Sequence, residues 1–139
     1  MNATPNWVVA LRFLLLGGCA AGVNWGSRFA WNLVMPFPEA VAAAYLTGMA
    51  LAFVLFRYFV FPGAVTSIRL QIRNFVIVNI IGFALTWGLS ITLVDWLFPR
   101  IGFNFHPQAV GHALAIAAPV VTSWFGHRHF TFRKLEPGL

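Results

Sequence analysis

The sequence predicts an all-α integral membrane protein with four transmembrane helices, arranged as two tandem repeats of two helices that share one orientation. Composition supports the membrane class: 60% of the 139 residues are hydrophobic and 9% are charged, whereas a soluble domain carries about 25% charged residues. Such a chain cannot cover a water-facing surface. Internal similarity supports the repeats, because two segments of the first half recur in the second half. We treat residues 1–139 as one membrane domain.

The clearest repeat lies at the ends of the second and fourth apolar stretches. Residues 53–61 are similar to residues 124–132, which lie 71 positions later. Each segment places one arginine, Arg57 or Arg128, beside aromatic side chains and finishes in a Phe-x-Phe sequence. A second correspondence has a spacing of 62 positions and relates Phe13 to Phe75, and Trp25-Gly26 to Trp87-Gly88.

Four apolar stretches are long enough to cross a bilayer, since a transmembrane helix needs roughly 20 largely apolar residues. We place them at about 11–34, 40–61, 74–97 and 108–130. Pro36 and Pro38 follow the first span, and Pro62 follows the second. Pro119 predicts a kink within the fourth. Repeat 1 therefore covers about 11–61 and repeat 2 about 74–132, with a linker of about 62–73.

The basic residues predict the topology. They gather near the N-terminus, in the linker and near the C-terminus, whereas the opposite side carries Arg100 beside the acidic residues. The positive-inside rule then makes both termini and the linker cytoplasmic. Topology accounts for the net charge of +6, so we expect no nucleic-acid partner. The residues on the cytoplasmic side are Arg12, Arg57, Arg69, Arg73, Arg128, Arg133 and Lys134.

Two short motifs resemble a known family. The segment Arg12-Phe13-Leu14-Leu15-Leu16-Gly17-Gly18 resembles the RFLLVGG start of GtrA-like membrane proteins, and the ends of spans two and four resemble that family's F-x-x-N-R-x-aromatic-x-F signature. The resemblance extends over about residues 11–134. This chain departs from the family at Phe56 and His127, which stand where the family has asparagine before the arginine, and at Asn24, a position that is often polar or acidic.

The resemblance implies a multi-pass protein of the bacterial inner membrane. It implies translocation of a polyprenyl-phosphate-linked monosaccharide, or of the polyprenyl phosphate carrier, for cell-surface polysaccharide glycosylation. Membrane glycosyltransferases that make and use such lipids are the implied partners. Because a single four-span unit is small for a carrier, we expect a homo-oligomer, most simply a dimer.

Arginines are the candidate ligands for a lipid phosphate. Arg57 and Arg128 lie near the cytoplasmic ends of spans two and four, and Arg12 and Arg73 lie near the starts of spans one and three. A guanidinium stays charged and binds phosphate oxygens in pairs. These four side chains would form a ring at the cytoplasmic boundary. They would equally serve as positive-inside residues that anchor the helix ends.

Arg28 is unusual because it lies in the outer half of span one, where the positive-inside rule predicts no arginine. A charge within the membrane normally faces a partner or a water-filled cavity. Glu39 and Asp95, near the same surface, are its candidate charge partners. The alternative is a second phosphate position that receives the head group from the cytoplasmic ring.

Polar side chains within the spans predict a path for a sugar. Asn24 lies one helical turn before Arg28, and Asn79 and Thr86 lie in span three. Amide and hydroxyl groups can satisfy sugar hydroxyls in a dry interior, although ordinary hydrogen bonds between helices would explain the same residues. His127 would help Arg128 to hold a phosphate, or would pack at the interface.

We expect no enzymatic activity, cofactor or metal. Four spans with short connections leave no soluble catalytic domain, and Cys19 is the single cysteine. Glu39 and Asp95 have no nucleophile or metal ligands beside them. No P-loop pattern occurs, so transport would depend on gradients of lipid or ions. The competing hypothesis is a non-transporting anchor that recruits a glycosyltransferase. A small multidrug exporter is disfavoured, because span one lacks a buried acid.

Overall fold

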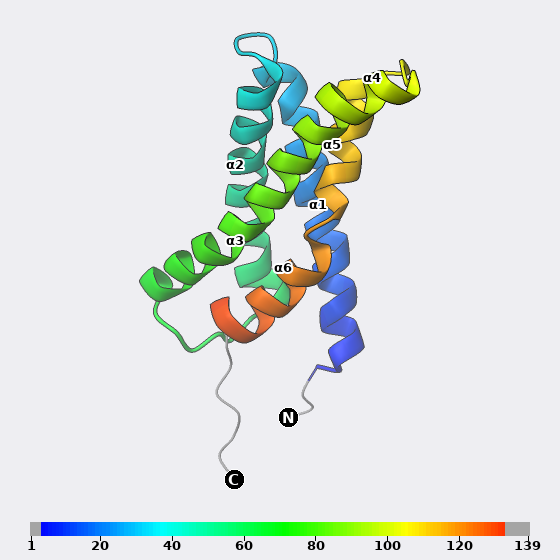
Figure 1. Ribbon diagram of the computed structural model, residues 1–139. Helices are drawn as coiled ribbons and strands as arrows, with labels where there is room; N and C mark the ends of the chain where they lie inside the picture. The colour runs from blue at the N-terminus through cyan, green and yellow to red at the C-terminus, as the bar shows by residue number, and fades with distance from the viewer. Residues whose placement is uncertain (1–3, 133–139) are drawn as a thin grey trace.

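The computed structural model describes residues 4–132, which fold into a bundle of four long helical segments (Figure 1). No strand occurs within this range, and all four segments are long and apolar enough to cross a membrane. The predicted all-α class and the four spans are therefore confirmed. The helices, with π-helical segments labelled η, are α1 (Asn6–Trp31), α2 (Phe37–Leu55), η1 (Phe56–Val60), α3 (Ile68–Ile91), η2 (Thr92–Leu97), α4 (Phe98–Ile101), α5 (Pro107–Ala117), α6 (Val120–Gly126) and η3 (His127–Thr131).

The third helical segment begins earlier than the sequence suggested. It starts at Ile68 rather than after Arg73, because the Ser67 hydroxyl accepts a hydrogen bond from the Leu70 N–H at 3.4 Å and caps the helix. The connection predicted at about 62–73 is correspondingly shorter. Apolar periodicity alone could not reveal this polar first turn. The predicted kink at Pro119 is confirmed, since α5 ends at Ala117 and α6 begins after the proline.

The helices form a closed ring of neighbours. α1 packs along α2, α2 packs on α3, α3 packs on α5, and α5 returns to α1. The start of α1 and the end of η3 lie at one end of the bundle (Figure 1), which we call the terminal end. The cytoplasmic location of this end stays a prediction. Arg133 and Lys134, which contributed to that prediction, lie outside the described residues.

The two similar sequence segments adopt the same backbone geometry. The π-helical segments η1 and η3 lie 71 positions apart and have equal lengths. Each is closed by one backbone hydrogen bond: Phe61 N–H donates to Phe56 O at 2.8 Å, and Phe132 N–H donates to His127 O at 2.9 Å. The chain then leaves the helix with φ of −120° at Phe61 and −113° at Phe132.

Aromatic side chains hold these two segments together at the terminal end. The rings of Phe61 and Phe132 stack with centroids 5.2 Å apart. Around this stack, Phe13 meets Trp124 edge-to-face at 5.0 Å. The equivalent pair is Phe75, 62 positions after Phe13, and Phe53, 71 positions before Trp124, and these rings meet edge-to-face at 5.1 Å. We call the following residues the aromatic cluster: Phe13, Phe53, Phe56, Phe61, Phe75, Trp124, His127 and Phe132.

Two tryptophans join the halves by reciprocal hydrogen bonds. The indole of Trp25 donates to Ala109 O at 2.9 Å, and the indole of Trp87 donates to Pro38 O at 3.0 Å. The two tryptophans are 62 positions apart, and the two acceptors are 71 positions apart. Each half therefore supports the start of the second helix of the other half. Paired contacts of this kind are those expected of two tandem repeats.

The stack of Phe61 on Phe132 generates a stability prediction. Phe132→Ala should lower the free energy of unfolding by about 3 kcal/mol, because it removes a ring that is 1% exposed. Phe130→Ala is the matched control, since Phe130 lies two residues away and is 44% exposed. Thermal unfolding of the purified protein in detergent measures both changes. Equal effects of the two substitutions would contradict the central role of the stack.

Candidate functional site

A cavity of about 320 Å³, here called the central cavity, lies within the bundle, and all four spans contribute to its wall. Asn24 of α1, Asn79 and Thr86 of α3, and His127 of η3 all line it. These are the four side chains proposed from sequence for a sugar path. The structure thus brings together residues that are separated by as many as 103 positions in the chain. Their role in binding stays a prediction.

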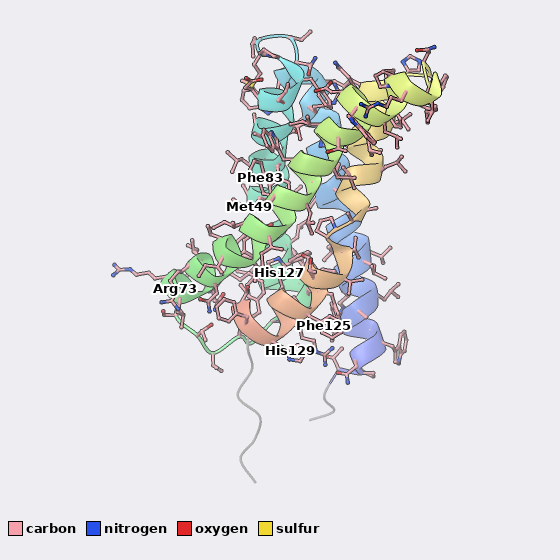
Figure 2. All side chains as sticks on the ribbon, in the orientation of Figure 1. Met49, Arg73, Phe83, Phe125, His127 and His129 are labelled. Atoms are coloured by element: carbon pink, nitrogen blue, oxygen red, sulfur yellow. The ribbon has the colours of Figure 1, made fainter. Side chains whose placement is uncertain are left out.

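A hydrogen-bonded chain crosses the bundle at the terminal side of the cavity. The Tyr45 hydroxyl donates to Asn79 Oδ1 at 3.1 Å, and Asn79 Nδ2 lies 3.4 Å from His127 Nε2. His127 Nδ1 lies 3.1 Å from Thr131 Oγ1. The His127 ring also stacks on Phe75, with centroids 4.4 Å apart. Figure 2 shows His127 at the level where α6 and η3 cross the bundle. Tyr45 was not identified from sequence, although a tyrosine among alanines in a span was a usable signal.

The cavity opens towards lipid between α1 and α6. Leu14 on α1 and Val120 on α6 both line the cavity and are 56% and 40% exposed. Gly18 also lines it, and a Cβ added there would meet no atom within 4 Å. α1 packs on α5 but makes little close contact with α6. We call this opening the α1–α6 crevice.

A matching groove of about 280 Å³ lies between α2 and α3, and larger side chains line it. Ile80 stands where the α1–α6 crevice has Gly18, and Phe83 stands where it has Ala21. The Tyr45–Asn79 hydrogen bond also crosses this groove. Figure 2 shows Met49 and Phe83 on this side of the bundle. The groove is lined by Ala42, Tyr45, Leu46, Met49, Val76, Asn79, Ile80 and Phe83, whose counterparts 71 or 62 positions away are Ala113, Ile116, Ala117, Val120, Leu14, Gly17, Gly18 and Ala21, all of which line the central cavity.

The two repeated arginines at the terminal end each have a local partner. Arg57 donates a hydrogen bond to Gln71 Oε1. Arg128 donates to Asn6 Oδ1 at 2.6 Å, and its guanidinium lies 5.2 Å from the Trp124 ring centroid. Among the described residues that line the central cavity, neither arginine appears. Both therefore flank the terminal end of the bundle.

Arg12 and Arg73 are the other two arginines expected in the cytoplasmic ring. Arg12 is exposed, and Arg73 donates hydrogen bonds of 3.1 and 3.2 Å to its neighbour Asn74. Figure 2 shows the Arg73 side chain pointing away from the bundle. No described contact joins Arg12 or Arg73 to Arg57 or Arg128. The ring of four arginines stays a prediction.

The proposed pairing of Arg28 with an acid is not seen. Glu39 and Asp95 are both exposed, and Glu39 lies in the first turn of α2, where the helix N-terminus favours a negative charge. Arg28 is 3% exposed and packs its guanidinium 3.9 Å from the Phe29 ring centroid. The carboxylates thus stay outside while the arginine turns inward. Residues 4–132 contain no group of three His, Cys, Asp or Glu side chains able to hold a metal ion.

The chain matches a protein-family model. The model described as GtrA/DPMS, transmembrane domain, matches residues 12–104, a range that covers more than half of the chain and includes nearly all of the first three spans. Comparisons with curated proteins and with solved structures gave no match.

The polar lining predicts that water enters the central cavity. In a Cys19→Ser background, Ser123→Cys should react with a small charged methanethiosulfonate, because Ser123 lines the cavity and a thiol ionises only where water reaches it. Val121→Cys, two residues away on α6 and 65% exposed towards the lipid side, should stay unmodified. Mass spectrometry of the protein in proteoliposomes measures both reactions. Labelling of Val121→Cys alone would contradict a hydrated cavity.

Proposed function

We propose that this chain, which belongs to the GtrA/DPMS transmembrane-domain family, translocates a polyprenyl-phosphate-linked monosaccharide, or the bare polyprenyl phosphate carrier, across the bacterial inner membrane. Family membership implies a role in membrane processes that involve polyprenyl-phosphate sugars. The observation that carries the proposal is the central cavity. Its wall is largely apolar but carries the polar groups of Asn24, Asn79, Thr86 and His127 inside the bundle, and the cavity has a side opening towards lipid.

The polar lining suits a monosaccharide. Ligand pockets for small molecules typically have volumes of about 300–1,000 Å³, and the cavity of about 320 Å³ lies at the lower end of this range. Asn24 Oδ1 is buried without a hydrogen-bond partner, so it can accept a hydrogen bond from a sugar hydroxyl. Asn79 Oδ1 accepts from Tyr45, and Thr86 Oγ1 donates to Ala115 O, and each oxygen can accept one further hydrogen bond in a region that lipid cannot solvate.

The α1–α6 crevice suits the prenyl tail. Removing a hydrocarbon chain from the lipid would cost about 0.8 kcal/mol for each CH₂ group, so a long tail must remain in the bilayer while the head group moves. A carrier for such a lipid needs a lateral opening along its path. Gly18 keeps this opening free of side chains, whereas Ile80 fills the equivalent position of the α2–α3 groove.

The terminal-end arginines suit the phosphate. Arg57 and Arg128 occupy equivalent positions, and each is held by a neutral amide, from Gln71 or Asn6. A phosphate oxygen is a stronger acceptor for a guanidinium than an amide oxygen is, so the lipid head group can displace either partner. Arg12 and Arg73 add positive charge at the same end. We propose that the protein works as a homo-oligomer beside membrane glycosyltransferases, and without an enzymatic activity of its own.

Blocking the crevice tests the proposal. Gly18→Ile introduces the side chain found at the equivalent position of the α2–α3 groove, and should slow the translocation of a polyprenyl-phosphate sugar by about tenfold or more, or about 1.4 kcal/mol in the barrier, because the side chain would occupy the opening that the prenyl tail needs. Gly26→Ile is the matched control, because Gly26 also has no atom within 4 Å of an added Cβ but does not line the cavity.

Transport is measured in proteoliposomes by the exposure of the labelled lipid to an impermeant sugar-oxidising reagent. Wild-type protein should accelerate exposure over empty liposomes, and Gly26→Ile should behave like the wild type. A wild-type protein that gives no acceleration, but retains a glycosyltransferase through membrane solubilisation, would contradict transport and favour the anchor hypothesis.

A further inference from the structure

Three buried side chains near the outer end of the central cavity carry polar atoms without hydrogen-bond partners. These atoms are Arg28 Nε, Asn24 Oδ1 and both ring nitrogens of His112. The side chains are 3%, 6% and 0% exposed, respectively. A buried polar group without a partner is costly, and more so in a membrane protein, where lipid offers no hydrogen bonds. The described side chains alone therefore leave this cluster unsatisfied.

The three residues lie close together. Asn24 and Arg28 are one turn apart on α1 and therefore share a face. His112 lies on α5, which packs on α1. The hydrogen bond from Trp25 to Ala109 joins these two antiparallel helices, with Arg28 one turn beyond it towards the end of α1 and His112 one turn beyond it towards the middle of α5. The cluster thus spans this contact between the two helices.

The cluster has an uncompensated positive charge. The guanidinium of Arg28 lies against the rings of Phe29 and Phe37, with distances of 3.9 and 5.7 Å to their centroids. Glu39 and Asp95, the two acids within the described residues, are exposed and form no ion pair with it. A buried charge in a membrane protein normally has a partner or serves function. An anion is the partner that this site lacks.

The repeat indicates that the cluster is not needed to build the fold. The positions equivalent to Arg28, Asn24 and His112 in the other half hold Ser90, Thr86 and Val41. Ser90 is satisfied within its own helix by donating to Thr86 O at 2.6 Å. The same helix packing is therefore reached without a charge. The arginine and the histidine lie on the α1–α5 pair, which borders the α1–α6 crevice, and the equivalent α3–α2 pair has neither at these positions.

We propose that Arg28, His112 and Asn24 form a buried anion site for a phosphate group, reached from the central cavity. Arg28 presents guanidinium donors, a neutral imidazole always carries one N–H donor, and the Asn24 amide adds another. Asn24 belongs to both the cavity wall and the cluster, so the ligand passes from one to the other. In this role the site is an outer position for the phosphate of the lipid head group, and this role rests on the proposed function. The binding of phosphate to the site can be measured without transport.

Substitution of Arg28 by methionine separates binding from structure. Arg28→Met keeps most of the side-chain volume and removes the charge, so without ligand the melting temperature should stay equal or rise, as observed when buried charges are replaced by apolar groups. Binding of farnesyl phosphate, measured by native mass spectrometry, should fall by about tenfold or more, since a hydrogen bond to a charged group contributes about 1.5–3 kcal/mol. His112→Val, which installs the counterpart residue, should weaken binding less.

Two controls make the result specific. Arg28→Lys retains the charge and should retain part of the binding, and Arg100→Met removes an exposed arginine whose guanidinium packs on Trp96 and should leave binding unchanged. Inorganic phosphate is tested beside farnesyl phosphate. Arg28-dependent binding of both probes identifies a phosphate site, whereas binding of farnesyl phosphate alone identifies a site that needs the lipid.

The proposal is overturned if Arg28→Met lowers the melting temperature and leaves farnesyl phosphate binding unchanged, which is the behaviour of a structural arginine. The proteoliposome assay keeps this failure apart from failure of the proposed function. If Arg28→Met transports the lipid at the wild-type rate, the outer phosphate site is rejected and the translocation proposal is retained. Absence of transport by the wild type, with Arg28-dependent phosphate binding, would retain the site and remove translocation.

Discussion

Lipid cannot form hydrogen bonds, so each polar group inside this bundle needs a partner from the protein or from a ligand. At the terminal end the protein supplies the partners: Tyr45, Asn79, His127 and Thr131 form a continuous chain beneath the cavity. At the outer end of the cavity it does not, and the polar atoms of Arg28 and its neighbours are left without partners. The distribution of satisfied and unsatisfied groups therefore separates the parts that hold the bundle together from the parts available to a ligand.

The two halves of the chain make equivalent contacts with different side chains. The stacked Phe61 and Phe132 and the reciprocal Trp25 and Trp87 hydrogen bonds give both halves the same helix packing. On this shared frame, glycine and alanine line the crevice on one side, while isoleucine and phenylalanine line the matching groove on the other. Repeats that share one orientation cannot exchange inward and outward states by symmetry alone. A carrier built this way needs a difference between its halves, and the crevice and the Arg28 cluster provide one.

The sequence predicted the spans well, because hydropathy responds to the solvent and the solvent here is lipid. It also identified Asn24, Asn79, Thr86 and His127, since a polar residue within an apolar span is conspicuous. It missed the start of α3, which depends on the local cap at Ser67. The sequence did not predict that Arg28 is separated from the acids, or that His112 belongs to the same cluster. Both features depend on the rotation of α1 relative to α5. The spacing of residues in a single sequence does not determine which side chains face each other where two helices pack.

The most direct test of this account asks which side of the bundle meets the lipid substrate. Leu14 lines the α1–α6 crevice and Val76 lines the α2–α3 groove, and the two positions are equivalent in the two halves. A photo-crosslinking amino acid at each position is exposed to a radiolabelled polyprenyl phosphate in proteoliposomes, and the labelled protein is counted. The account predicts strong crosslinking from position 14 and background crosslinking from position 76. Equal crosslinking from both, or crosslinking mainly from position 76, would contradict it.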